Sequence, residues 1–170
     1  YRQAANQGDA EAQTNLANCF YNGIGCEENK NEAIEWYQKA SEQGYAEAQY
    51  NLANYLYKEK HDKNAQVILN LYWNAAKQGY ANAQFDLAYL FEKGDICEKN
   101  TDSAVEWYRR AAEQGQINAQ YNLANLLIES DKFKNNVEAV SWYKKLAENN
   151  IAIAELKLAQ CLEDGKGCKE

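Results

Sequence analysis

The sequence predicts an all-α solenoid of about four and a half helix hairpins, and three observations support this prediction. A short phrase, Ala-Gln followed two residues later by Leu-Ala, occurs four times, and a fifth copy keeps its Ala and Leu positions. The copies begin 36, 35, 36 and 35 residues apart, at Ala12, Ala48, Ala83, Ala119 and Ala154. Apolar residues recur with helical spacing in two segments of every repeat, and the 170 residues include no proline.

The first helix of each repeat is predicted from the repeated phrase itself. In the first copy, Ala12, Leu16 and Phe20 occur at positions i, i+4 and i+8, which places them on one face of a helix. We therefore expect these residues and their equivalents in the other copies to lie in the core.

The second helix of each repeat is predicted from large aromatic anchors. In chain order, the anchors are Ala33, Trp36, Tyr37 and Ala40; Ile68, Leu71, Tyr72 and Ala75; Ala104, Trp107, Tyr108 and Ala111; and Ala139, Trp142, Tyr143 and Leu146. Each second helix is followed by Gly44, Gly79, Gly115 or Asn150. Gly and Asn are the residues that best tolerate the left-handed conformation that closes a helix. We expect the anchors, tryptophans included, to be core residues.

Successive hairpins are expected to stack, because a hairpin of this size cannot bury its own apolar face. No segment rich in Pro, Gly and Ser separates the repeats, so residues 1–170 are predicted to form a single solenoid domain. Residues 1–5 match the end of a second helix, and neither end carries a polar capping repeat. These features are typical of a fragment of a longer protein.

A longer period is also present. Gly23, Gly94 and Gly165 are 71 residues apart, and so are Cys26, Cys97 and Cys168. The second and fourth repeats lack this glycine-rich loop and have charged loops over 58–64 and 129–136. Duplication of a two-hairpin unit is the simplest explanation.

The repeats resemble the Sel-one-like repeat (SLR) family, which is related to the tetratricopeptide repeat. The first repeat matches the family pattern at Ala12, Leu16, Phe20, Gly23, Gly25, Ala33, Trp36, Tyr37, Ala40 and Gly44. The resemblance covers the whole chain. It implies a right-handed superhelix of antiparallel helix pairs that acts as a scaffold or adaptor for protein complexes, without catalysis.

Two departures from the family pattern stand out. The glycine that follows the repeated Leu is Ala in every copy, which favours the helix. In the second repeat, Leu71 replaces Trp and Ile68 replaces a small residue. Because these positions are three apart on one helical face, the two volume changes are expected to offset each other.

The resemblance places the first helices on the concave face, and two rows of residues there are candidates for partner binding. The candidate residues are Tyr50, Phe85 and Tyr121, two residues before the repeated Leu, and Asn18, Asn54, Tyr89 and Asn125, two residues after it. Aromatic rings and amides together suit a peptide or helix of a partner protein. Acidic residues near these rows favour a neutral or basic segment. The alternative is that the aromatic residues only pack between adjacent first helices.

Charge and composition restrict the other functions. The 18 basic and 25 acidic residues give a formal net charge of −7, which disfavours nucleic acid and anionic membrane surfaces as partners. No apolar run is long enough to span a bilayer. Five cysteines in a chain large enough to build a core favour reduced thiols, and hence weakly a cytoplasmic location.

The cysteines and the one histidine indicate no enzyme and no cofactor. Cys26, Cys97 and Cys168 are expected to fill the core, although local pairs of Cys19 with Cys26 or of Cys161 with Cys168 stay open. His61 lies in a charged loop, and no common metal, nucleophile or phosphate motif is present. The sequence therefore predicts a non-enzymatic binding scaffold. The alternatives are an architectural spacer or self-assembling repeat array and, less favoured, a thiol- or carboxylate-based enzyme.

Overall fold

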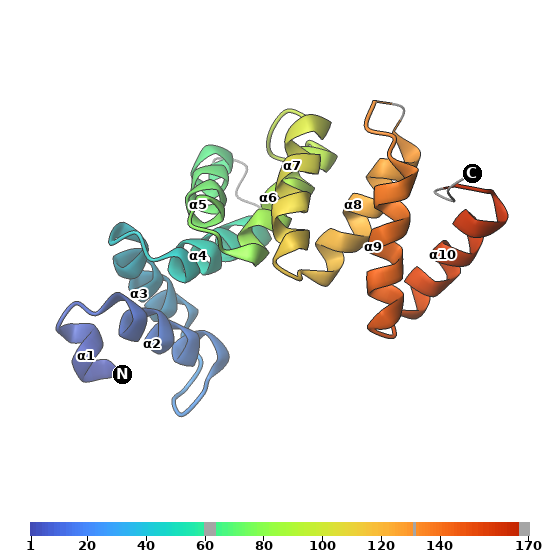
Figure 1. Cartoon of the computed structure of the whole chain (residues 1–170). Helices are drawn as coiled ribbons and strands as arrows, with labels where there is room; N and C mark the ends of the chain where they lie inside the picture. The colour runs from blue at the N-terminus through green and yellow to red at the C-terminus, as the bar shows by residue number, and fades with distance from the viewer. Residues whose placement is uncertain (60–63, 131, 167–170) are drawn as a thin grey trace.

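The computed structural model describes residues 1–59, 64–130 and 132–166, and within these ranges it consists of ten α-helices without a strand (Figure 1). The helices are α1 (Arg2–Asn6), α2 (Ala10–Asn22), α3 (Lys30–Glu42), α4 (Ala46–Lys58), α5 (Ala65–Lys77), α6 (Ala81–Lys93), α7 (Thr101–Glu113), α8 (Ile117–Glu129), α9 (Asn136–Glu148) and α10 (Ala152–Glu163). The all-α prediction is confirmed.

The helices form two alternating sets. The A helices (α2, α4, α6, α8 and α10) contain the repeated phrase, and the B helices (α3, α5, α7 and α9) contain the aromatic anchors. Each helix packs mainly against its neighbours in the chain. The hairpins therefore follow one another along an arc, with the two termini at opposite ends (Figure 1).

The helix ends follow the local sequence signals. Asn29, Asn100 and Asn135 cap α3, α7 and α9 by accepting a backbone N–H, as N-cap residues do. The predicted left-handed positions are also confirmed, since Asn150 has a φ of 60° and Gly44, Gly79 and Gly115 have positive φ as well. Turns of fixed geometry thus set the spacing of successive hairpins.

The core consists of Ala, Leu and Phe residues of the A helices packed against the B-helix tyrosines. Tyr37, Tyr72, Tyr108 and Tyr143 are all buried. In the second repeat Ile68 is buried and Leu71 is half-buried.

The prediction that the anchor tryptophans are core residues is wrong for two of the three. Trp107 is buried, whereas Trp36 and Trp142 are only half-buried. Each anchor Trp is paired with an exposed basic side chain of its own helix, and at Trp36 and Trp142 the ring borders the surface. The basic residue three positions later lies over its ring, as Lys39 does over Trp36 at 4.1 Å from the ring centroid.

A buried glutamine in each of four A helices donates to a carbonyl of the preceding helix, and three of the four also accept from the Gln that follows the next B helix. Gln84 donates from Nε2 to the Ala76 carbonyl of α5 (3.1 Å), and its Oε1 accepts from Gln114 at the end of α7 (2.7 Å). Gln13 and Gln49 make the same two contacts in their repeats. The sequence analysis did not predict this role, although the same Gln recurs in four copies of the repeated phrase.

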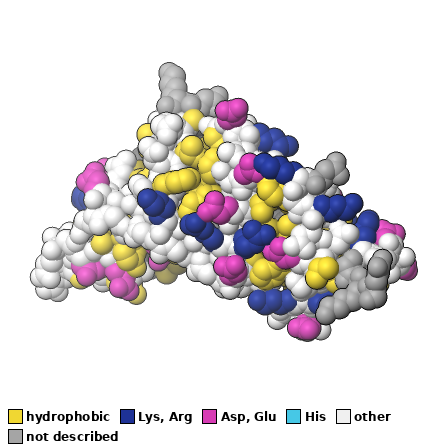
Figure 2. Space-filling view, turned by 45° about the horizontal axis from the view of Figure 1, so that its top comes forward, with side chains coloured by type: hydrophobic (Ala, Val, Ile, Leu, Met, Phe, Trp, Pro, Cys, Tyr) yellow, Lys and Arg dark blue, Asp and Glu magenta, His cyan; other side chains and the backbone are white. Residues whose placement is uncertain are grey.

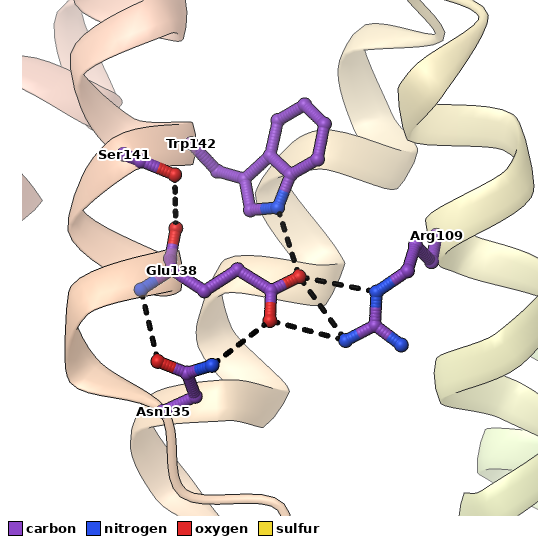
Figure 3. Close-up of polar contacts among 5 residues, drawn as sticks. All are labelled: Arg109, Asn135, Glu138, Ser141 and Trp142. Atoms are coloured by element: carbon purple, nitrogen blue, oxygen red, sulfur yellow. Dashed lines mark hydrogen bonds and ion pairs between the residues drawn. The ribbon is translucent and has the colours of Figure 1, made fainter.

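The outer seam between α7 and α9 is held by a polar cluster around Glu138 (Figure 3). The Arg109 guanidinium donates from Nε and Nη2 to the two Glu138 carboxylate oxygens, both at 3.1 Å. Asn135 and Trp142 also donate to this carboxylate. At the seam between α5 and α7, Trp73 and Trp107 pack edge to face instead. The seams therefore differ in chemistry while the hairpin frame stays the same.

None of the described helices combines the length and the apolar character needed to cross a bilayer.

Candidate functional site

The predicted aromatic row lies partly in the hairpin packing. Tyr50, Phe85 and Tyr121 are half-buried, and each ring packs against the B-helix tyrosine of its own hairpin, at centroid distances of 6.1, 5.7 and 6.2 Å. Tyr50 also contacts Tyr80 at the start of α6 (5.1 Å). Each ring thus stabilises the hairpin and leaves only part of its surface on the A-helix face.

The predicted amide row serves first as a set of internal clasps, each a hydrogen bond from a B-helix tyrosine to the A-helix amide of the same hairpin. The Tyr37 hydroxyl donates to Asn18 Oδ1 at 2.5 Å, and Tyr72 and Tyr143 donate to Asn54 and Asn125 in the same way, both at 2.6 Å. Burial raises the pKa of each of these tyrosines, so the hydroxyls stay protonated and act as donors. The amide oxygens of this row are therefore occupied within the hairpin.

The row changes at Tyr89, which has no amide oxygen to accept from the tyrosine of its hairpin. Tyr108 instead donates to Glu92 Oε2 (2.8 Å), and its hydroxyl oxygen accepts from Asn122 (3.1 Å). Tyr89 itself is 39% exposed. Glu92, three residues further along the same helix, is a structural acceptor that the sequence predictions did not identify.

Two hollows occupy equivalent places in successive repeats. The polar hollow, about 190 Å³, is lined by Asn18, Tyr21, Asn22, Tyr37, Asn51, Asn54, Tyr55 and Lys58. The aromatic hollow, about 310 Å³, is lined by Asn54, Tyr57, Lys58, Tyr72, Phe85, Asp86, Tyr89 and Leu90. One repeat after the polar hollow, Asp86 therefore stands in place of Asn51 and Tyr89 in place of Asn54.

Asp86 lines the aromatic hollow, and its carboxylate is called the acidic floor of this hollow. Its carboxylate is half-buried, and within the described ranges no basic nitrogen lies within 4.0 Å of it. Burial raises the pKa of this carboxyl group, while the nearby Tyr50 hydroxyl acts in the opposite direction. The sequence signal for this site was the change from Asn to Asp inside a repeated phrase.

A third hollow, about 90 Å³, lies where α10 meets α8 and α9. Its lining includes Asn125, Tyr143, Gln160 and Lys157. Lys157 stands two repeats after Asp86 in the same row. The A-helix face therefore carries opposite charges at equivalent positions.

Charges of both signs are interspersed with hydrophobic side chains on the face that Figure 2 shows. Among the described residues visible there, basic side chains form no continuous strip of the kind that tracks a nucleic-acid backbone.

The cysteines differ in part from the sequence prediction. Cys26 is exposed and Cys97 half-buried, so core filling is wrong for Cys26. The reason is that each thiol closes its loop by donating to a carbonyl of the preceding A helix: Cys26 to Cys19 (3.7 Å) and Cys97 to Leu90 (3.6 Å). Cys19 and Cys26 are both free thiols.

Cys168 and His61 lie outside the described residues. In the part that is described, no three His, Cys, Asp or Glu side chains form a group able to hold a metal ion.

A family model described as the Sel1 repeat matches residues 1–9, 10–45, 46–59, 81–116, 117–151 and 152–170. The unmatched stretch, 60–80, contains the second helix in which Leu71 replaces the family Trp. No curated protein matches the chain.

Solved structures show the same fold. A Sel1 repeat protein from Oxalobacter formigenes is 32% identical with a TM-score of 0.83, and the match covers 96% of this chain and 66% of that one. The protein c5321, a protective antigen of uropathogenic Escherichia coli with an SLR fold, is 33% identical with a TM-score of 0.85, over 99% of this chain and 37% of that one. A sel1 repeat protein from Klebsiella pneumoniae has a TM-score of 0.62 at 22% identity, covering 100% and 83% of the two chains.

Proposed function

Because the chain belongs to the Sel1 repeat family, we propose that it is a scaffold that holds an extended segment or a helix of a partner protein against its A-helix face. Repeats of this family generally mediate protein interactions, and the family is typically non-enzymatic.

The observation that carries this proposal is the series of hollows along the A helices. Two successive repeats place a hollow at the same position, and residues of both predicted rows line these hollows. Backbone groups of a bound segment would meet amides and hydroxyls in the polar hollow, and its side chains would meet rings in the aromatic hollow. Repetition of one site along an extended face is how solenoid proteins bind long segments.

The charges on this face favour a neutral or basic segment. Asp86 lines the aromatic hollow, and Glu47 accepts from Asn18 beside the polar hollow. Of the lysines near them, Lys93 is paired with Glu92 at 2.6 Å, which neutralises its charge locally. An acidic segment would be repelled by the remaining carboxylates.

A matched pair of substitutions tests the binding face. Tyr89 on an A helix and Trp73 on a B helix are both 39% exposed, so Tyr89→Ala and Trp73→Ala each remove a similar exposed aromatic group, on different helix sets. We expect Tyr89→Ala to weaken capture of the protein's partners from its native lysate by about tenfold, as loss of an aromatic interface residue does. Quantitative mass spectrometry of the captured proteins measures the effect.

The control is that Trp73→Ala captures the same proteins as the unmodified chain, with circular dichroism unchanged for both variants. If Trp73→Ala removes the captured proteins and Tyr89→Ala does not, the partner binds the B-helix face and the proposed site is wrong.

A second role, stacking onto further helical repeats, is favoured by α10. This helix exposes Ile153, Leu156 and Leu162 to solvent. Ile153 and Leu156 are three residues apart and so lie on one helical face, which favours contact with a further apolar element. If repeats stack there in solution, light scattering will show a mass that rises with concentration, and Leu156→Lys will return the mass to that of one chain.

A further inference from the structure

We propose that the aromatic hollow between α4 and α6 is a receptor for an arginine side chain of the bound partner, with the guanidinium group paired with the Asp86 carboxylate and stacked on the surrounding rings. This inference rests on the proposed scaffold function and names the chemistry of one of its subsites.

The first step is that Asp86 replaces a hydrogen-bond donor by an acceptor. The residue at this position in the neighbouring repeats is an Asn that donates within the protein: Asn51 to Asn18 Oδ1 (3.3 Å) and Asn122 to the Tyr108 hydroxyl (3.1 Å). An ionised carboxylate can only accept. The aromatic hollow therefore offers only hydrogen-bond acceptors at this position, where the neighbouring repeats have an amide that can both donate and accept.

The second step is that Asp86 has a neutral hydrogen-bonding neighbour, the Tyr50 hydroxyl, but no cationic partner among the described residues, while two hydroxyls of the hollow are committed elsewhere. The Tyr72 hydroxyl donates to Asn54 Oδ1 (2.6 Å), and the Tyr57 hydroxyl donates to Asp95 Oδ2 (2.6 Å). The bond to Asp95 is the main cause that raises the pKa of Tyr57 to about 12, so this hydroxyl stays a committed donor. A half-buried carboxylate without a cationic partner is unfavourable, and a cationic ligand would relieve that cost.

The third step is the aromatic lining. Tyr57, Phe85 and Tyr89 surround the acidic floor, and the faces of such rings attract cations. The protein already shows this attraction at one of these rings, since Lys93 Nζ lies 5.4 Å from the Tyr89 centroid. A planar guanidinium group both stacks on rings and pairs with a carboxylate through two parallel hydrogen bonds, which an ammonium group does not.

The exposed side chain of Lys58 is the one basic group that lines this hollow within the described residues. Its ammonium group can remain in water while its alkyl stem covers the hollow, so it does not replace the ligand. Removing its charge with Lys58→Ala is expected to tighten arginine binding modestly, by about twofold. A divalent cation is a poor alternative ligand, because Asp86 is the only carboxylate among the described residues of the lining and such ions need several oxygen ligands.

The test is an NMR titration of the backbone amides with three small probes. N-acetyl-arginine amide is expected to shift the amides around residues 54–58 and 85–90, N-acetyl-lysine amide to shift them less, and N-acetyl-citrulline amide, the neutral isostere, not at all. Asp86→Asn restores the amide of the neighbouring repeats and should fold, yet weaken arginine binding by about tenfold or more. Lys157→Asn, in the same row two repeats away, is the matched control and should leave arginine binding unchanged.

Equal shifts with citrulline, unchanged arginine binding in Asp86→Asn, or shifts only outside this hollow would overturn the proposal. Partner capture separates this failure from failure of the scaffold function. If arginine does not bind but Tyr89→Ala still loses the captured partner, the binding face stands and its arginine subsite is wrong. If arginine binds as expected but neither variant of the capture experiment loses a partner, the subsite stands and the scaffold assignment is wrong.

Discussion

The polar and aromatic hollows occupy the same place in successive hairpins, yet one is satisfied internally and the other is not. In the polar hollow, Asn18 accepts from both Tyr37 and Asn51 and donates to Glu47. In the aromatic hollow, the Tyr72 to Asn54 clasp is kept, but Asp86 brings a half-buried charge without a basic partner among the described residues. The comparison separates the frame, which the repeats share, from the variable positions, which give each hollow its own chemistry.

The strongest way to break this comparison is to remove the shared frame itself. Tyr37→Ala and Tyr72→Ala should each lower the free energy of unfolding by about 3–5 kcal/mol, because both rings are buried and a cavity remains. Urea denaturation followed by circular dichroism measures the loss. Tyr89→Ala, which removes an exposed ring, should change stability by no more than about 0.5 kcal/mol. If Tyr89→Ala costs as much as Tyr72→Ala, the division into frame and variable positions fails.

A smaller effect should distinguish the two clasps. Tyr72→Phe removes the donor to Asn54 Oδ1 and should cost about 1–3 kcal/mol, the penalty of a partly buried acceptor left unpaired. Tyr37→Phe should cost less, about 0.5–1.5 kcal/mol, because Asn51 still donates to Asn18 Oδ1. The same urea titration compares the two variants. Equal losses, or a larger loss in Tyr37→Phe, would show that the two hollows do not differ in how fully their amide oxygens are hydrogen-bonded within the protein.

The fold was predictable because it depends on spacing within the chain. Apolar positions such as Ala12, Leu16 and Phe20 define one helical face, and Gly44 and its equivalents define the turns. These signals depend on local geometry that repeats every 35 or 36 residues.

The partners of the polar side chains were not predictable in this way. The Asn18 amide meets a tyrosine 19 residues away, and the Gln84 amide meets Gln114, 30 residues away. Such contacts depend on how helices from different segments pack, which a single helix pattern does not contain. The sequence therefore placed the two rows on the A helices but did not show that the amides are already used within the hairpins. The exposure of Cys26 was missed for the same reason, since its thiol bonds to a carbonyl of the preceding helix.

The smallest expected effect concerns the pH dependence that Asp86 adds to the aromatic hollow. Burial raises the pKa of this carboxyl above its ordinary value of 3.8, so the folded state binds the proton more tightly than the unfolded state. Its contribution to stability is therefore fully present below pH 3.8 and is lost as the pH rises through the folded pKa.

Asp86→Asn should then stabilise the protein at neutral pH by up to about 0.5 kcal/mol, with the gain vanishing in acid. The reciprocal Asn51→Asp should lose stability at neutral pH, because it removes a donor and adds a charge to a satisfied hollow. Thermal unfolding of both variants across pH measures the two effects. A gain in Asp86→Asn that persists below pH 3.8 would show that the amide, and not removal of the charge, stabilises this hollow.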